Sequence, residues 1–123
     1  MQPRTWIACG AFAMFLAVAL GAFGAHGLKT RIDAEHLAIW NTGVQYHALH
    51  SLALFGFGVW RERSDGRALA GWAFVAGIVM FSGSLYGLAI GGPSWLGPIT
   101  PLGGLAFLVG WLAIAIEALR KRD

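Results

Sequence analysis

Two long stretches without a formal charge constrain this sequence more than any other feature. The first runs from Thr5 to Leu28 and the second from Ala68 to Ile116. A helix needs about 20 apolar residues to cross the roughly 30 Å hydrocarbon core of a bilayer. The first stretch is therefore long enough for one membrane span and the second for two. Only 12% of the residues are charged, against about 25% in soluble domains, so a lipid-facing surface explains the composition better than a water-soluble core.

Helix breakers and caps divide the chain into four predicted spans. The Gly- and Pro-rich segment 91–101 splits the second stretch, because these residues end helices. Thr100 is the expected N-cap of the last span. Residues 34–60 are predicted to form one long helix that starts after Thr30 or Asp33 as N-cap and is apolar enough beyond Val44 to enter lipid. The predicted spans are approximately residues 6–26, 42–60, 69–90 and 101–119. The expected fold is all-α, a membrane-embedded four-helix bundle that forms a single domain over residues 1–123.

The basic residues orient these spans. Lys29 and Arg31 lie in the predicted outer loop, whereas the other basic residues lie on the side of the N-terminus: Arg4, Arg61, Arg63, Arg67, Arg120, Lys121 and Arg122. Cytoplasmic loops carry the excess of Lys and Arg, so both termini are expected in the cytoplasm and the protein in the cytoplasmic (inner) membrane. A cleaved signal peptide is the alternative for the first stretch, but that stretch is longer than a usual signal core. Nucleic acid is not expected as a partner, because the basic residues flank apolar spans.

Small residues recur at helical spacing in two of the spans. Cys9, Ala13, Ala17, Gly21 and Ala25 form one stripe in the first span, and Gly83, Gly87 and Gly91 form another in the third. Such stripes let helices approach closely in lipid. The residues expected to pack helices are Gly21, Gly83, Gly87 and Gly91. Their partner is by default a helix of the same chain, and a second copy is the alternative. At the end of the first span, Gly27 is expected to be a left-handed helix stop that follows His26.

Polar side chains gather in the outer halves of all four predicted spans, whereas the inner halves are nearly all apolar until Glu117. The cluster consists of His26, Tyr46, His50, Ser82, Ser84, Tyr86 and Thr100. An unpaired polar group in hydrocarbon costs several kcal/mol, so these groups are expected to converge inside the protein. Either they satisfy one another by hydrogen bonds, or they line a cavity open to the outer side. Polar residues inside spans are functional candidates by default.

A metal or haem site is the least favoured interpretation of this cluster. His47 and His50 share a helix face, but Cys9 and Glu117 are expected at the opposite end. The sequence contains no catalytic triad, paired carboxylates or phosphate-binding loop, so we expect neither enzymatic activity nor a cofactor or bound metal. The single cysteine excludes an intramolecular disulfide.

Several motifs in this order resemble one family. They are Leu20 to His26 (LGAFGAH), Tyr46 with His50, Phe81 to Tyr86 (FSGSLY), Thr100-Pro101-x-Gly103-Gly104 and Gly110-Trp111. The chain is similar to the small, uncharacterised bacterial membrane proteins typified by YgdD and YwdK (domain of unknown function 423, UPF0382). The resemblance implies a multi-spanning membrane protein without an established activity. His47 departs from the pattern, since the family typically has glutamine there, and this weakens a metal pair with His50.

Three functional hypotheses follow. The first is a non-enzymatic membrane component, such as a transporter or accessory subunit, that binds a small molecule, lipid or ion in the outer polar cavity. The second is a structural protein that acts through helix–helix interaction. The third is an enzyme or a metal or haem redox subunit. The lipid bilayer is the expected surrounding, and a homo-oligomer or a membrane partner protein is left open.

Overall fold

The computed structural model describes residues 1–120, and every regular element among them is helical. Lys121, Arg122 and Asp123, two of which were assigned to the inner side, lie outside the described residues. The elements are α1 (Pro3–Phe23), the π-helical turn η1 (Gly24–Leu28), α2 (Ala34–Arg61), α3 (Leu69–Gly77), the π-helical turn η2 (Ile78–Ser82), α4 (Gly83–Ala89), the 3-10 turn η3 (Ser94–Leu96) and α5 (Ile99–Arg120).

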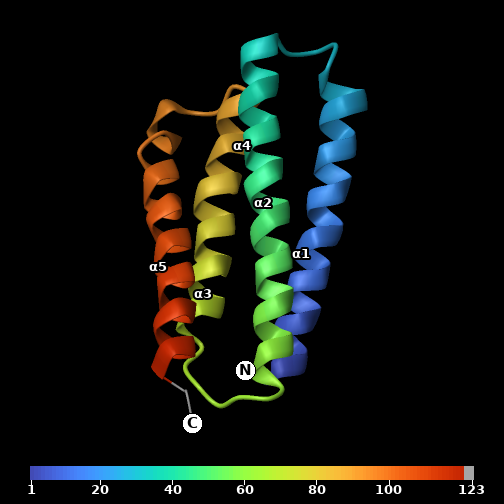
Figure 1. Ribbon diagram of the computed structural model, residues 1–123. Helices are drawn as coiled ribbons and strands as arrows, with labels where there is room; N and C mark the ends of the chain where they lie inside the picture. Colours follow the sequence, from blue (N-terminus) through green and yellow to red (C-terminus); the bar gives the residue numbers. More distant parts are fainter. Residues whose placement is uncertain (121–123) are drawn as a thin grey trace.

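These elements build four long helical rods that lie side by side (Figure 1). Each rod packs on the next one along the chain: α1 on α2, α2 on the α3–η2–α4 rod, and α3 and η2 on α5. One buried cluster of side chains draws on all four rods: it consists of Trp6, Leu54, Phe57, Ala70, Phe74 and Phe107.

Three of the four rods are long and apolar enough to cross a membrane: Pro3–Leu28, Leu69–Ala89 and Ser94–Arg120. The expected span at 42–60 is not among them. Its histidines lower the mean hydropathy of α2, but His47 and His50 are only 5% and 3% exposed. Hydropathy averages all faces of a helix, whereas α2 buries His47, His50 and Ser51 and exposes Leu49, Leu52 and Val59.

The beginning of α2 is as predicted, while two other helix ends differ. Asp33 is the N-cap of α2, and its side chain accepts a hydrogen bond from the His36 backbone N–H at 2.8 Å. That bond lowers the pKa of the Asp33 carboxyl. The expectation for Thr100 as an N-cap is wrong, because α5 already begins at Ile99. The expectation for Gly27 as a left-handed stop is also wrong: within residues 1–120, only Gly91 has a positive φ, of 90°.

Glycines bring the rods together by making room for aromatic rings. A Cβ atom added at Gly77 would collide with the ring of Phe107, and one at Gly110 would collide with the ring of Phe74. The same holds for Gly71, which lies against Trp6. Because small residues allow close helix approach without help from water exclusion, these glycine–aromatic pairs position the helices.

The glycines that the spacing singled out behave differently from one another. A Cβ atom at Gly21 would lie 3.2 Å from Val44 of α2, so Gly21 faces a neighbouring helix. Gly87 lies against Leu96 of η3. A Cβ atom added at Gly83 would have no neighbour within 4 Å, and Gly91 forms a turn. Packing of the whole Gly83–Gly91 stripe against a helix of the same chain is therefore not observed, and an external partner stays a prediction.

Candidate functional site: a polar network and an arginine pocket

The polar side chains of α2 bond to the α3–η2–α4 rod and to each other. His47 Nδ1 lies 2.8 Å from the Tyr86 hydroxyl. Ser82 donates to the Gly43 carbonyl at 2.7 Å, and Ser51 donates to the His47 carbonyl at 2.7 Å. Ser51 and Ser82 are fully buried. This side of α2 is therefore satisfied inside the protein, as hydrocarbon surroundings require.

His50 uses both of its ring nitrogens. Nδ1 lies 2.8 Å from the Tyr46 carbonyl, and the Trp111 indole N–H donates to Nε2 at 3.0 Å. A carbonyl only accepts and an indole N–H only donates, so the proton sits on Nδ1 and the imidazole is neutral. The ring also stacks on Phe107 with centroids 3.6 Å apart. A ligand that takes a nitrogen of His50 must first break one of these bonds.

A second polar pair joins α4 to α5. Ser84 donates to the Phe81 carbonyl at 2.9 Å, and its oxygen lies 2.5 Å from that of Thr100. Thr100 also reaches the Leu96 carbonyl at 3.5 Å, so either hydroxyl can be the donor in the contact between Ser84 and Thr100. Thr100 thus links two helices and does not cap its own.

The sequence-predicted site residues fall into two groups. His50, Ser82, Ser84, Tyr86 and Thr100 are joined in the contacts described above, through α2, η2, α4 and α5. His26 is exposed on η1, and Tyr46 is half-exposed, with its ring against Phe81 and Phe107. Among residues 1–120, no three of the His, Cys, Asp and Glu side chains lie close enough together to hold a metal ion. The outer-facing cavity stays a prediction.

Sequence reasoning missed two tryptophan donors in this region. Trp40 donates its indole N–H to the Leu20 carbonyl at 3.0 Å, and Trp111 donates to His50. A buried indole N–H usually needs an acceptor, so a tryptophan inside a predicted span was the available indication. It did not say which acceptor.

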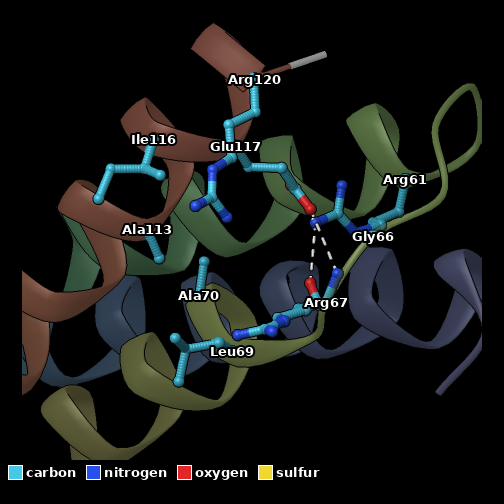
Figure 2. A pocket seen from close by; sticks show the side chains of 9 residues that line it. All are labelled: Arg61, Gly66, Arg67, Leu69, Ala70, Ala113, Ile116, Glu117 and Arg120. Carbon is cyan, nitrogen blue, oxygen red and sulfur yellow. Dashed lines mark hydrogen bonds and ion pairs between the residues drawn. The ribbon is translucent and has the colours of Figure 1, made fainter.

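A pocket of about 520 Å³ lies at the opposite end of the molecule, beside the loop between α2 and α3 (Figure 2). Its walls come from that loop, the beginning of α3 and the end of α5. The residues that line it are Arg61, Gly66, Arg67, Leu69, Ala70, Ala113, Ile116, Glu117 and Arg120. The start of α1 and the end of α5 lie at this same end (Figure 1).

An ion pair holds this pocket together. The Arg61 guanidinium donates to Glu117 Oε2 and also to the Arg67 carbonyl at 2.8 Å. Glu117 Oε1 accepts from the Arg67 backbone N–H at 3.2 Å. The Arg61 side chain is only 8% exposed and lies 4.6 Å from the ring centroids of both Phe57 and Trp60. Arg61 and Glu117 thereby tie the loop to the last helix.

The pocket was not predicted, although several of its residues were noted for other reasons. Arg61 and Arg67 served only as indicators of orientation, and Glu117 only as a polar residue at the inner end. Because 56 residues separate Arg61 from Glu117, no local pattern connects them. The one available indication was that Glu117 is the first charge after a long uncharged stretch.

Comparison with known protein families matches residues 20–104 to the family described as Protein of unknown function (DUF423). The chain belongs to the DUF423 family. The match includes the polar network from Gly43 to Thr100 but ends before Trp111, Glu117 and Arg120. The pocket of this DUF423 protein is therefore only half inside the matched region.

Relatives from three bacteria support the same assignment. The UPF0382 membrane protein YwdK of Bacillus subtilis is 48% identical over 95% of this chain and 98% of its own length. The UPF0382 inner membrane protein YgdD of Escherichia coli is 38% identical over 99% of this chain and 95% of its own length. A UPF0382 membrane protein of Haemophilus influenzae is 37% identical over 92% of each chain. No solved structure matches this DUF423 protein.

The names and the apolar helices together identify an integral membrane protein of an uncharacterised family. Within this DUF423 chain, the motifs that carried the resemblance contact one another. Tyr46, His50 and Trp111 form one chain of hydrogen bonds, and Ser84 and Thr100 form another. A Cβ atom at Gly103 would collide with the Phe81 backbone. These motif residues therefore lie in contacts within and between the helices.

Proposed function

We propose that this DUF423 protein is a non-enzymatic, four-span component of the bacterial cytoplasmic membrane with both termini in the cytoplasm. One observation supports the fourth span: His47, His50 and Ser51 of α2 are buried, while Leu49, Leu52 and Val59 of the same helix are exposed. An apolar outer face suits lipid even where the mean hydropathy is low. The positions of the basic residues support the orientation.

Reporter fusions test the number of spans and their direction together. Alkaline phosphatase, which is active only outside the cytoplasm, is fused after Arg31, after Arg63 or after Asp123. We expect activity only after Arg31. Activity after Arg63 would show that α2 does not cross the membrane, and activity after Asp123 would overturn the cytoplasmic C-terminus. A cytoplasmic fluorescent reporter at the same positions is the matched control and should give the opposite pattern.

We further propose that the outer-half polar network is where this component binds a small molecule, lipid or ion. Support comes from the convergence of three rods on it: His47 lies on α2, Tyr86 on α4 and Thr100 on α5. His26 adds an exposed polar group on η1, whereas Tyr46 contributes its ring, which lies against Phe81 and Phe107, and not its hydroxyl. Neither a cofactor nor a metal is part of the proposal.

Native mass spectrometry of protein released from a mild detergent tests this binding function. We expect a reproducible extra mass on the wild-type chain and on Tyr46→Phe, and its loss in Tyr86→Phe. Both variants remove one phenol oxygen, but only that of Tyr86 contacts His47. Absence of any extra mass on the wild-type chain would contradict the proposal and favour a purely structural network.

The structural alternative has an observation of its own. Gly83 is exposed and has no neighbour within 4 Å, so a helix of a second copy or of a partner protein has room to approach α4 there. The same spectra report the subunit count. An oligomer that Gly83→Leu dissociates, with no ligand mass, would support assembly as the function.

A further inference from the structure

The arginine pocket carries more positive charge than its own residues neutralise. Arg61, Arg67 and Arg120 line it together with a single acid, Glu117. Glu117 pairs with Arg61, and the side chains of Arg67 and Arg120 make no ion pair within residues 1–120. Both side chains reach into the pocket (Figure 2). Two cations are therefore left to face whatever occupies it.

Arg61 holds this end of the pocket together and is not itself free to take a ligand. Its side chain is more than nine-tenths buried, and its terminal nitrogens already bond to Ser64, to Glu117 and to the Arg67 carbonyl. Its Nε atom has no hydrogen-bond partner within the described residues, but it is buried as well. Arg67 and Arg120 are therefore the cations that a ligand in the pocket would meet.

The remaining wall of the pocket is apolar. Leu69 and Ala70 come from the first turn of α3, and Ala113 and Ile116 come from α5. A free inorganic anion gains nothing from these side chains, whereas an acyl chain would be sheltered by them. The volume also falls in the range of small-molecule sites. Cations at one side and aliphatic groups at the other describe a receptor for an amphiphile with an anionic head.

We propose that this pocket binds one anionic glycerophospholipid, with its phosphate at Arg67 and Arg120 and the start of an acyl chain along Ala113 and Ile116. Basic pockets between membrane helices are suited to such headgroups. The lipid would also join the α2–α3 loop to the end of α5, next to the Arg61–Glu117 pair. The proposal rests on the membrane setting of the proposed function but not on the direction of the spans.

The test is native mass spectrometry of the full chain in mild detergent, titrated with phosphatidylglycerol or with phosphatidylcholine of the same acyl chains. We expect one phosphatidylglycerol to be retained in preference to phosphatidylcholine. Arg67→Gln and Arg120→Gln should each weaken retention roughly fivefold, the effect of one cation near a lipid surface. Arg63→Gln is the matched control, because Arg63 is exposed in the same loop but does not line the pocket.

Further arms of the experiment distinguish a lipid in the pocket from diffuse surface charge and from a free phosphate. Ala113→Leu fills the apolar part without changing a charge and should also reduce retention, while the circular dichroism of all variants should match the wild-type chain. Equal weakening by Arg63→Gln would mean a diffuse surface charge and overturn the proposal. Equal retention of the two lipids, or binding of glycerol phosphate as tight as that of phosphatidylglycerol, would overturn it too. None of these outcomes depends on the reporter fusions, so the two proposals fail separately.

Discussion

At the scale of single residues, the histidine in the middle of α2 shows how this protein tolerates polar groups in an apolar setting. His50 donates to one carbonyl, accepts from one indole and stacks on one ring. The sequence predicted that such groups would converge inside. It could not predict the partner, because Trp111 lies 61 residues away in the sequence.

Replacing Trp111 by phenylalanine isolates the contribution of that donor. The aromatic bulk is largely kept, while His50 Nε2 loses its partner, so we expect a loss of about 1–2 kcal/mol in the free energy of unfolding. Unfolding in mixed detergent micelles measures it. Trp95→Phe, in an exposed connection, should change stability by less than about 0.5 kcal/mol. Equal effects of the two variants would contradict the assigned role of the indole.

The ion pair at the other end gives a second prediction at this scale. Glu117→Gln leaves the buried Arg61 guanidinium without its countercharge, and breaking a buried pair by removing one partner costs about 3 kcal/mol. Thermal unfolding followed by circular dichroism measures the change. Glu62→Gln, an exposed acid next to Arg61 in sequence, is the control and should be close to neutral. A stable Glu117→Gln variant would mean that the pair does not hold the loop.

At the scale of helices, the sequence predicted where a helix begins and ends better than it predicted its internal geometry. The range of α2 agrees with the predicted 34–60 to within one residue, because a cap, an amphipathic start and a charged end all agree there. The π-helical turns η1 and η2 were not predicted. Their residues, Gly24–Leu28 and Ile78–Ser82, continue the apolar pattern of the flanking helices, so nothing in the sequence pattern marked the change of helix type.

Two adjacent glycines of α5 test the close approach of helices. A Cβ atom at Gly103 would collide with the Phe81 backbone, whereas one at Gly104 would lie 3.8 Å from the Phe81 ring. Backbone cannot move aside without shifting a helix, so Gly103→Ala should lose about 1–3 kcal/mol of stability. Gly104→Ala should be neutral or gain up to about 1 kcal/mol from helix propensity. Unfolding in detergent compares the two, and a neutral Gly103→Ala would contradict the packing.

At the scale of the whole molecule, the packing of the four rods determines which apolar side chains are buried. The sequence predicted four rods in the observed order but not which faces of α1 and α5 pack, since both helices are apolar all round. Membrane helices without a polar face carry little information about which side is buried. The arginine pocket was missed for a related reason: its residues are far apart in the sequence and come together only in the folded chain.

Neighbouring residues of α5 measure this arrangement. Phe107 is 4% exposed and Leu108 is 65% exposed. Phe107→Ala removes a ring that packs against Gly77 and His50, so we expect a loss of about 3 kcal/mol or more. Leu108→Ala, on the outward face, should cost less than about 1 kcal/mol in detergent. A larger loss for Leu108→Ala would show that another surface covers α5.

The link between Arg61 and Glu117 also bears on how the chain is made. During synthesis, the arginines of the α2–α3 loop emerge well before Glu117, which is 56 residues further on. In the proposed topology, these cations have no partner on α5 while the first two helices enter the bilayer, so they can hold their loop on the cytoplasmic side. Glu117 can pair with Arg61 only after the end of α5 has been made. Arg61 would thus first help to orient its loop during insertion and later tie that loop to α5 in the folded protein.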